Sequence, residues 1–280
     1  MIVDFHTHIY PPSIREQRET YVTRDRTFGE LFADPRAKMA NAEELIAAMD
    51  EDGVDRSVVM GIGWTDQGLA REANDYLIDA VSRFPDRLTG FAGVSPAWGG
   101  EAAALEAERC AGAGLRGIGE LHPSEQGYDL GSESMITPLM DVVREHGLIV
   151  TTHSSEPVGH TYQGKGDTRP EMLWRHIQKY PDVTLVCAHW GGGLPFYALM
   201  PEVAEALGNV YFDTAASPFL YDARVFEVVA GLVGADHILL GSDYPLLRAS
   251  RLTRQVQDSS LSDADRGAIL GGNAARLLGL

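Results

Sequence analysis

The feature that most constrains this chain is the alternation of short apolar runs with segments of helical apolar spacing along its whole length. Eight apolar runs bounded by Gly, Pro or polar residues predict strands over residues 2–8, 56–63, 88–95, 115–121, 148–153, 184–189, 210–215 and 238–243. Strands that alternate with helices favour a parallel sheet, because a parallel connection needs a crossover. The chain has 280 residues, and barrels commonly run to about 250 residues as one domain. We therefore predict a single (β/α)8 TIM barrel spanning residues 1–280.

The segment between the first strand and the first helix departs from this regular pattern. Residues 10–40 are polar and charged, and they form the longest stretch between two predicted elements. We expect a long loop that lies over the barrel mouth as a lid or rim. The helix that follows is well delimited, with Asn41 as N-cap, Glu44 in the capping-box position and Gly53 at its end.

The strongest local chemical signal is the pair His6 and His8 in the sequence DFHTH. Side chains two residues apart on a strand point to the same face, so both imidazoles can hold one ion. Two histidines can also satisfy each other by hydrogen bonding in a core, so the pair alone leaves both interpretations open.

Other metal-binding residue types follow the later strands. His153, His189 and Asp243 end the fifth, sixth and eighth predicted strands, and Glu120 ends the fourth. The carboxyl ends of barrel strands share one rim, where active sites are built. Imidazoles with a carboxylate predict a divalent ion, zinc by preference, although manganese, iron or cobalt suit similar sites. Glu120 either binds substrate or bridges a second ion, since that strand end has no lysine that could be carboxylated.

Several further side chains are candidates for substrate binding. They follow strand ends or lie in the Gly-rich, charged loop after the fifth strand, and each is equally compatible with a solvated loop or with core packing. They are Tyr10, His122, His160, Tyr162, Lys165, Arg169 and Trp190. His146, His176 and His237 fall in helical segments or at the opposite end of the barrel, where we expect structural roles.

The composition of the chain indicates which classes of binding partner are disfavoured. The 40 acidic and 23 basic residues give a formal net charge of −17, which repels nucleic acids and anionic membranes. The first residues resemble no signal peptide, no apolar run is long enough to span a bilayer, and Cys110 and Cys187 show no paired spacing. We expect a cytoplasmic enzyme with a small-molecule substrate, and its assembly into a homo-oligomer stays open.

The motifs together resemble the amidohydrolase superfamily, and specifically its amidohydrolase-related branch. The segments that carry the resemblance are VDFHTHIYPP, NAEELIAAMDEDGVDRSVVMG, GLRGIGELHP, CAHWGGG, ILLGSDYP and ILGGNAARLLGL. This branch includes metal-dependent hydrolases and enzymes similar to aminocarboxymuconate-semialdehyde decarboxylase, and GIGELHP is also similar to a strand of TatD-type hydrolases. The resemblance implies that His6, His8, His153 and Asp243 are metal ligands. It implies that His189 is either a ligand of a second metal or a catalytic residue beside the first.

Two reactions are compatible with these residues. We expect metal-dependent hydrolysis, in which metal-bound hydroxide attacks an ester, lactone or amide, Asp243 transfers the proton and His189 stabilises the developing charge. The alternative is non-oxidative decarboxylation, or hydration, of an aromatic or muconate-type acid, with Lys165, Arg169 and Arg248 as candidate partners for a carboxylate. A metal-binding scaffold without activity is disfavoured by the complete ligand set.

Overall fold

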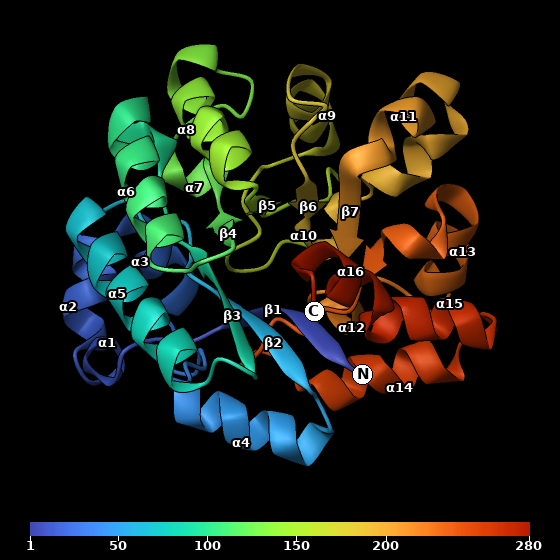
Figure 1. Cartoon of the computed structure of the whole chain (residues 1–280), viewed down its shortest axis with the longest axis horizontal. Helices are drawn as coiled ribbons and strands as arrows, with labels where there is room; N and C mark the ends of the chain where they lie inside the picture. The colour runs from blue at the N-terminus through green and yellow to red at the C-terminus, as the bar shows by residue number, and fades with distance from the viewer.

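The computed structural model describes residues 1–280 and contains one parallel eight-stranded barrel ringed by helices (Figure 1). The strands pair in chain order, and every pair is parallel. Backbone hydrogen bonds join the first strand to the residues that follow the last one: the Phe5 amide donates to the Leu240 carbonyl at 2.7 Å, and the Asp243 amide donates to the His6 carbonyl at 2.9 Å. The predicted (β/α)8 barrel is confirmed.

The strands occupy the predicted runs but are shorter. They are β1 (Val3–His8), β2 (Arg56–Met60), β3 (Leu88–Ala92), β4 (Gly117–Leu121), β5 (Ile149–Thr152), β6 (Leu185–Cys187), β7 (Val210–Asp213) and β8 (Ile238–Leu239). The apolar runs continue past the strand ends because the first residues of the following loops are also buried. His153, His189 and Asp243 therefore lie just beyond their strands.

The helices fall between the strands as the alternation requires. They are α1 (Pro12–Glu16), α2 (Arg18–Arg24), α3 (Arg26–Phe32), α4 (Ala42–Asp52), α5 (Gln67–Arg83), α6 (Gly100–Gly112), α7 (Pro123–Gln126), α8 (Glu133–His146), α9 (Pro170–Lys179), α10 (Ala188–Gly191), α11 (Pro201–Ala206), α12 (Ser217–Leu220), α13 (Val225–Val233), α14 (Ala249–Asp258), α15 (Asp263–Gly267) and α16 (Asn273–Leu278). The predicted ends of α4 are confirmed: Asn41 and Glu44 form a reciprocal capping box, and Gly53 has a φ of 70°.

Residues 10–40 are not the long loop that the polar composition suggested. They fold into α1, α2 and α3, whose apolar faces pack around Phe28, and the Phe28 ring stacks on Trp64 with centroids 5.5 Å apart. Asp25 is buried, caps α3 through the Phe28 amide, and accepts hydrogen bonds from the Thr65 and Asp66 amides. The apolar residues were too widely spaced among charged ones to reveal these short helices.

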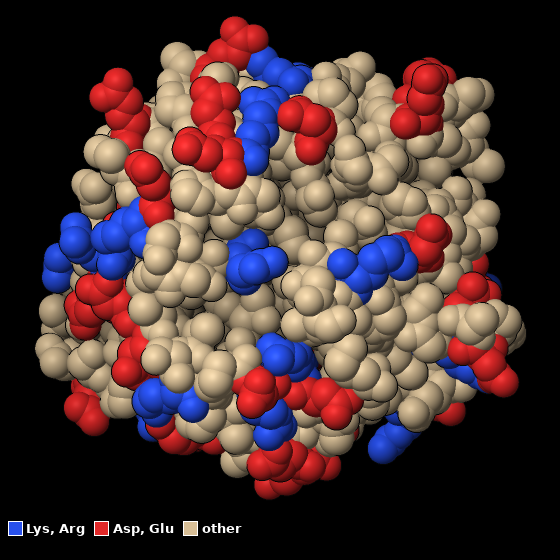
Figure 2. Space-filling view, viewed as in Figure 1, with Lys and Arg blue, Asp and Glu red and all other residues tan.

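The barrel interior holds its own apolar cluster. It includes Val3, Phe5, Met60, Phe91 and Leu239, and residues of α16 pack against it. No helix combines the length and the apolarity needed to cross a membrane. On the face seen in Figure 2, basic side chains lie in small separate groups, most of them beside acidic ones. This face offers no continuous basic surface to a polyanion.

Candidate active site

A cavity of about 460 Å³ opens where the carboxyl ends of the strands meet the segment 10–40. At its base lie residues that follow or end the strands, namely His8, Glu120, His153, His189 and Asp243. Its walls are largely apolar and include Leu31, Phe32, Ile62, Phe219, Leu220 and Leu246. The predicted convergence of the strand ends at one rim therefore produces a pocket with a polar base and apolar sides.

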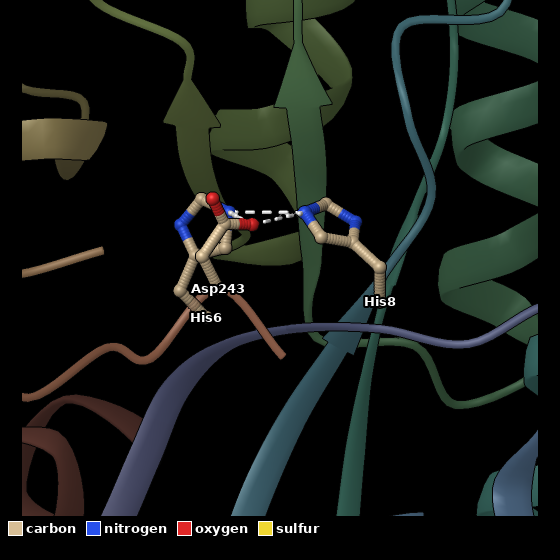
Figure 3. Close-up of side chains that lie close together, drawn as sticks. All are labelled: His6, His8 and Asp243. Atoms are coloured by element: carbon tan, nitrogen blue, oxygen red, sulfur yellow. Dashed lines mark hydrogen bonds and ion pairs between the residues drawn. The ribbon is translucent and has the colours of Figure 1, made fainter. Parts of the chain in front are cut away.

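His6, His8 and Asp243 form one group of potential ligands (Figure 3). The Nε2 atoms of His6 and His8 lie 3.0 Å apart, and the Asp243 Oδ1 atom lies 3.8 Å from His6 Nε2 and 3.5 Å from His8 Nε2. The nearest ligand atoms of the three side chains lie within 4.8 Å of one another, which suits coordination of a single ion after small rotations.

Glu120 lies at the centre of the base and contacts histidines on both sides. Its Oε2 atom is 3.5 Å from His6 Nε2 and 3.6 Å from His8 Nε2. Its Oε1 atom is 3.1 Å from His153 Nδ1 and 3.4 Å from His189 Nε2. Burial opposes the charge on Glu120, but the surrounding imidazoles, His6 foremost, hold its pKa well below the ordinary value.

The other ring nitrogen of each of these four histidines is bonded to an acceptor. His6 Nδ1 pairs with the Asp213 carboxylate at 2.8 Å, and His189 Nδ1 with the Ala215 carbonyl at 3.1 Å. His8 Nδ1 lies 3.3 Å from the carbonyl of residue 60, and His153 Nε2 lies 2.9 Å from the carbonyl of residue 165. These nitrogens must carry the proton, because carbonyl and carboxylate oxygens only accept.

When these rings are neutral, the nitrogen that points into the cavity base carries a lone pair and no proton. These nitrogens face the carboxylates of Glu120 and Asp243. A buried group made only of acceptors is costly unless positive charge is present. The pKa values of the histidines show the same need for positive charge. Burial alone would lower these pKa values. Instead, Asp213 and Glu120 raise the pKa of His6 well above its usual value, and Glu120 raises that of His189 to about 9. The donor set fits a divalent metal ion, as the sequence indicated.

Asp213 is a further candidate residue, one that was not predicted from the sequence. Besides holding His6, its Oδ1 atom accepts hydrogen bonds from the backbone amides of His189 and Ala215, both at 3.0 Å. Burial would raise the pKa of this carboxyl, but the neighbouring His6 keeps it below the ordinary value. Its position at the end of β7, on the same rim as the other candidates, was the signal that could have identified it.

The backbone is strained at two of the residues at the base of the cavity. His189 has a φ of 54° and Asp243 a φ of 65°, a left-handed conformation that non-glycine residues rarely adopt. Such strain gathers at functional sites, where the surrounding contacts must maintain it. Here Asp213 binds the His189 amide and the His6 carbonyl binds the Asp243 amide, so the contacts that orient the ligands also hold these turns.

The predicted substrate-binding residues divide into two groups. Tyr10, His122, His160 and Tyr162 line the cavity, whereas Lys165, Arg169 and Trp190 do not. Lys165 Nζ donates to loop carbonyls, Arg169 pairs with Asp167, and Trp190 is buried against Phe226. These three side chains lie outside the cavity lining, because each is engaged within its own loop or in the core.

The cation nearest the pocket is a lysine that the sequence analysis did not single out. Lys38 is the one lysine or arginine in the cavity lining, and its Nζ atom donates to the Leu246 carbonyl at 3.3 Å. Arg248, a third candidate from the sequence, pairs instead with Glu51 and Asp52 on α4. Nothing in the spacing of residues 10–40 marked Lys38, because its position depends on how α1–α3 fold.

His122 closes one side of the base. Its ring stacks on His153 with centroids 4.0 Å apart and an interplanar angle of 11°, and its Nε2 lies 3.2 Å from the Gly164 carbonyl. Burial and the nearby His153 lower the pKa of His122 to about 3, so the ring is neutral at physiological pH. It therefore acts as a flat, uncharged support between β4 and the loop after β5.

The family model described as amidohydrolase matches residues 3–280. The chain belongs to the amidohydrolase family. The motifs quoted from the sequence had indicated this membership, and the match covers almost the entire chain. The observed barrel and the convergence of its rim residues agree with it.

Curated relatives of this amidohydrolase are decarboxylases. The chain is 24% identical to 2-amino-3-carboxymuconate-6-semialdehyde decarboxylase of Dictyostelium discoideum, with 99% of this chain and 91% of that protein covered. It is also 24% identical to gamma-resorcylate decarboxylase of Polaromonas sp., over 75% of this chain and 76% of the relative.

A solved structure with the same fold is 5-carboxyvanillate decarboxylase of Novosphingobium aromaticivorans in complex with manganese and 4-hydroxy-3-methoxy-5-nitrobenzoic acid. It superposes with a TM-score of 0.82 at 19% identity, covering 100% of this chain and 96% of that one. At this identity the likeness establishes the shared fold.

These relatives overturn the leading functional prediction. Hydrolysis of an ester, lactone or amide was predicted from the sequence, and that prediction is wrong, since the relatives are named as decarboxylases of aromatic or muconate-type acids. The alternative reading is the better supported one. The reason for the error is chemical: both reactions use the same ligands and the same proton-transferring residues, so the rim motifs could not distinguish them.

Proposed function

We propose that this amidohydrolase is a metal-dependent, non-oxidative decarboxylase of an aromatic or muconate-type carboxylic acid. The observation that carries the proposal is the pocket itself, an apolar cavity of about 460 Å³ over a base of imidazole and carboxylate acceptors. Such a cavity suits a planar, largely apolar ring whose acidic group points to the base. The named activities of the relatives support the same reaction class.

The ligands proposed for the ion are His6, His8, His153 and Asp243, with Glu120 and His189 beside them. A bound divalent ion would neutralise and orient the substrate carboxylate at the base of the cavity. Solved relatives contain manganese, so we propose manganese as the first ion to test and zinc, expected from the residue types, as the alternative.

The chain's own residues then have separate tasks. In decarboxylation the bond between the ring and the carboxylate breaks, its electron pair stays on the ring carbon, carbon dioxide leaves and a proton takes its place. Asp243 lines the cavity at its base, and we assign it the delivery of that proton. We assign His189 a place beside the ion, where its inward Nε2 atom faces Glu120 at 3.4 Å.

The walls of the cavity would bind the ring. Phe32 from α3 and Phe219 from α12 supply aromatic surface from two different connections, and Leu246 follows Asp243 by three residues. Lys38 offers a cation at the cavity wall, with one of its N–H groups already bound to Leu246. We propose that Lys38 binds a second anionic or acidic substituent of the substrate.

The test is an assay of carbon dioxide release by the apo protein and by protein loaded with manganese or zinc. The substrates are 2,6-dihydroxybenzoate, 5-carboxyvanillate, 6-methylsalicylate and simple benzoates. We expect release only from metal-loaded protein, together with formation of the ring product that carries hydrogen in place of the carboxylate. Equal turnover after complete metal removal, or no release from any of these acids by fully loaded protein, would count against the proposal.

A further inference from the structure

Glu156 is a carboxylate that no basic side chain of its own loop neutralises. It follows β5 and contacts the cavity lining through Tyr162, whose hydroxyl donates to Glu156 Oε2 at 3.4 Å. The Oε1 atom of Glu156 is buried and accepts no hydrogen bond. The basic residues of the loop are bound elsewhere, Lys165 to backbone carbonyls and Arg169 to Asp167. Because a buried carboxylate is costly without donors, the Tyr162 proton must point to Glu156.

Two tyrosines share this carboxylate as a neighbour. Burial raises the pKa of Tyr221, and the adjacent Glu156 raises it further. The same causes, burial first, raise the pKa of Tyr162. Both phenols therefore keep their protons, and the Tyr162 hydroxyl remains a donor to the carboxylate.

The Tyr162 ring is held in place by its own loop. The His160 ring lies 5.4 Å from it between centroids, and Lys165 Nζ lies 5.7 Å from its centroid, where a cation is attracted to the ring face. The Nζ atom of Lys165 also donates to the carbonyls of residues 158 and 160, both at 3.1 Å. Lys165, which lies outside the cavity lining, thus helps to position a ring that belongs to it.

The contact with Glu156 determines what Tyr162 can offer to a substrate. A phenolic oxygen carries one proton, and once that proton is donated to Glu156 the oxygen can only accept. Hydrogen bonds in series polarise one another, so the contact with a carboxylate makes this oxygen a stronger acceptor. Lys38, the cation of the cavity lining, can only donate. The cavity wall therefore carries an acceptor from the loop after β5 and a donor from the segment 10–40.

We propose that Glu156 fixes the Tyr162 hydroxyl as a hydrogen-bond acceptor in the cavity, so that the site selects acids that carry a hydroxyl or amino group. The inference rests on the proposed binding of an aromatic or muconate-type acid and adds a determinant of which acid binds. A site that receives a hydrogen bond from its substrate rejects an analogue without the donor, because the polar group of the site is then left unpaired. Glu156 is a positioning residue, since it acts on the substrate only through Tyr162.

The experiment measures binding separately from turnover. Manganese-loaded protein is titrated calorimetrically with 3- and 4-hydroxybenzoate and with 3- and 4-fluorobenzoate, because fluorine is small and cannot donate a hydrogen bond. Substituents at these positions lie away from the carboxylate that the cavity base would bind. We expect the hydroxybenzoate to bind about tenfold more tightly than its fluoro counterpart at one of the two positions. Carbon dioxide release from the same acids is assayed in parallel.

Variants assign this preference to the two side chains. Tyr162→Phe removes the acceptor, keeps the ring and should abolish the preference. Glu156→Met leaves the Tyr162 hydroxyl without its carboxylate and should reduce the preference to about threefold. Fluorobenzoate should bind to both variants as to the wild type, whereas a structural disturbance would weaken both acids alike. Tyr197→Phe is the matched control, because Tyr197 is 49% exposed and lies outside the cavity lining, and it should keep the full preference.

The outcomes separate this inference from the proposed reaction. Equal affinity of the wild type for the hydroxy and fluoro acids at both positions, or a full preference in Tyr162→Phe, would overturn the inference, even if Glu156→Met fails to fold. A full preference in folded Glu156→Met would overturn the role of Glu156. Carbon dioxide release without a preference would contradict this inference alone. A preference without release from any acid would count against the decarboxylase and leave the inference standing.

Discussion

The barrel rim and the segment 10–40 build the same cavity by different means. At the rim, each candidate ligand lies near the end of a strand or just after it, and the four imidazole rings are oriented by hydrogen bonds to backbone carbonyls or to Asp213. In the segment 10–40, the wall is set by aromatic packing around Phe28, and Lys38 is exposed with a single hydrogen bond. The rim is therefore suited to fixing the chemistry, and the segment to selecting the substrate.

The largest effect should come from the rim. Asp243→Asn removes both a proposed ligand and the proposed proton carrier, and since general acid catalysis typically contributes 10²–10⁴-fold, we expect kcat for carbon dioxide release to fall about 10³-fold. Elemental analysis of the purified variant would separate loss of the ion from loss of proton transfer. Asp222→Asn, at an exposed aspartate in the connection after β7, is the matched control and should keep its activity. Full activity in Asp243→Asn would remove this residue from the mechanism.

The next effect should come from the segment, and it concerns stability rather than chemistry. Phe28 is fully buried between the rings of Tyr10, Phe32 and Trp64, so Phe28→Ala should cost about 3 kcal/mol in the free energy of unfolding, as large aromatic-to-alanine changes in cores do. Urea denaturation would measure it. Phe196→Ala, at a ring that is 39% exposed, should cost much less. A wild-type unfolding midpoint in Phe28→Ala would mean that the segment is not tightly packed on the barrel.

A smaller effect should follow from weakening the hydrogen bond that orients His6 at the rim. Asp213→Asn weakens the hold on His6 Nδ1 while leaving all the ligands in place, and loss of such partners typically weakens metal binding 10–100-fold. We expect the manganese dissociation constant to rise within that range and kcat at saturating manganese to recover most of its value. If kcat stays low at saturating metal while the affinity is unchanged, Asp213 has a role other than positioning.

The same contrast explains what could be predicted from sequence. The position of His6, His8, Glu120, His189 and Asp243 at one rim follows from strand periodicity and from the rule that parallel strands end together. Their orientation did not follow, because it depends on contacts between distant strands, such as that of Asp213 with His6, 207 residues apart.

The position of the segment 10–40 could be predicted from the sequence, but its secondary structure could not. Its position over the mouth followed from its location between the first strand and α4, yet its three helices have few residues each and depend on packing against Trp64 from another connection. Short helices are marginal on their own, so the local sequence carries a weak signal for them. Lys38 was missed, and Lys165 and Arg169 lie outside the cavity lining, because side chains on irregular connections are positioned by tertiary contacts.

The smallest effect tests whether the segment selects the substrate. Lys38→Met removes the one lysine or arginine from the cavity lining. Since an exposed charge pair is weakened by solvent, we expect KM for an acid with a second anionic substituent to rise about fivefold, equivalent to about 1 kcal/mol. The kcat should change little, because Lys38 binds the substrate at a distance from the reacting carboxylate. Benzoates without the second group should show no change in KM.

Arg36→Met provides the matched control, because Arg36 lies two residues away in the same connection, is 89% exposed and pairs with Asp34 outside the cavity. Both variants lower the net positive charge of the segment equally, so a long-range electrostatic effect would raise KM in both. A rise confined to Lys38→Met, and to doubly charged acids, would assign the selection to that side chain. An equal rise in KM for all acids would instead mean that Lys38 supports the cavity wall through its hydrogen bond to Leu246. In that case Lys38 would not select the substrate, and the contrast between the rim and the segment 10–40 would not hold at this residue.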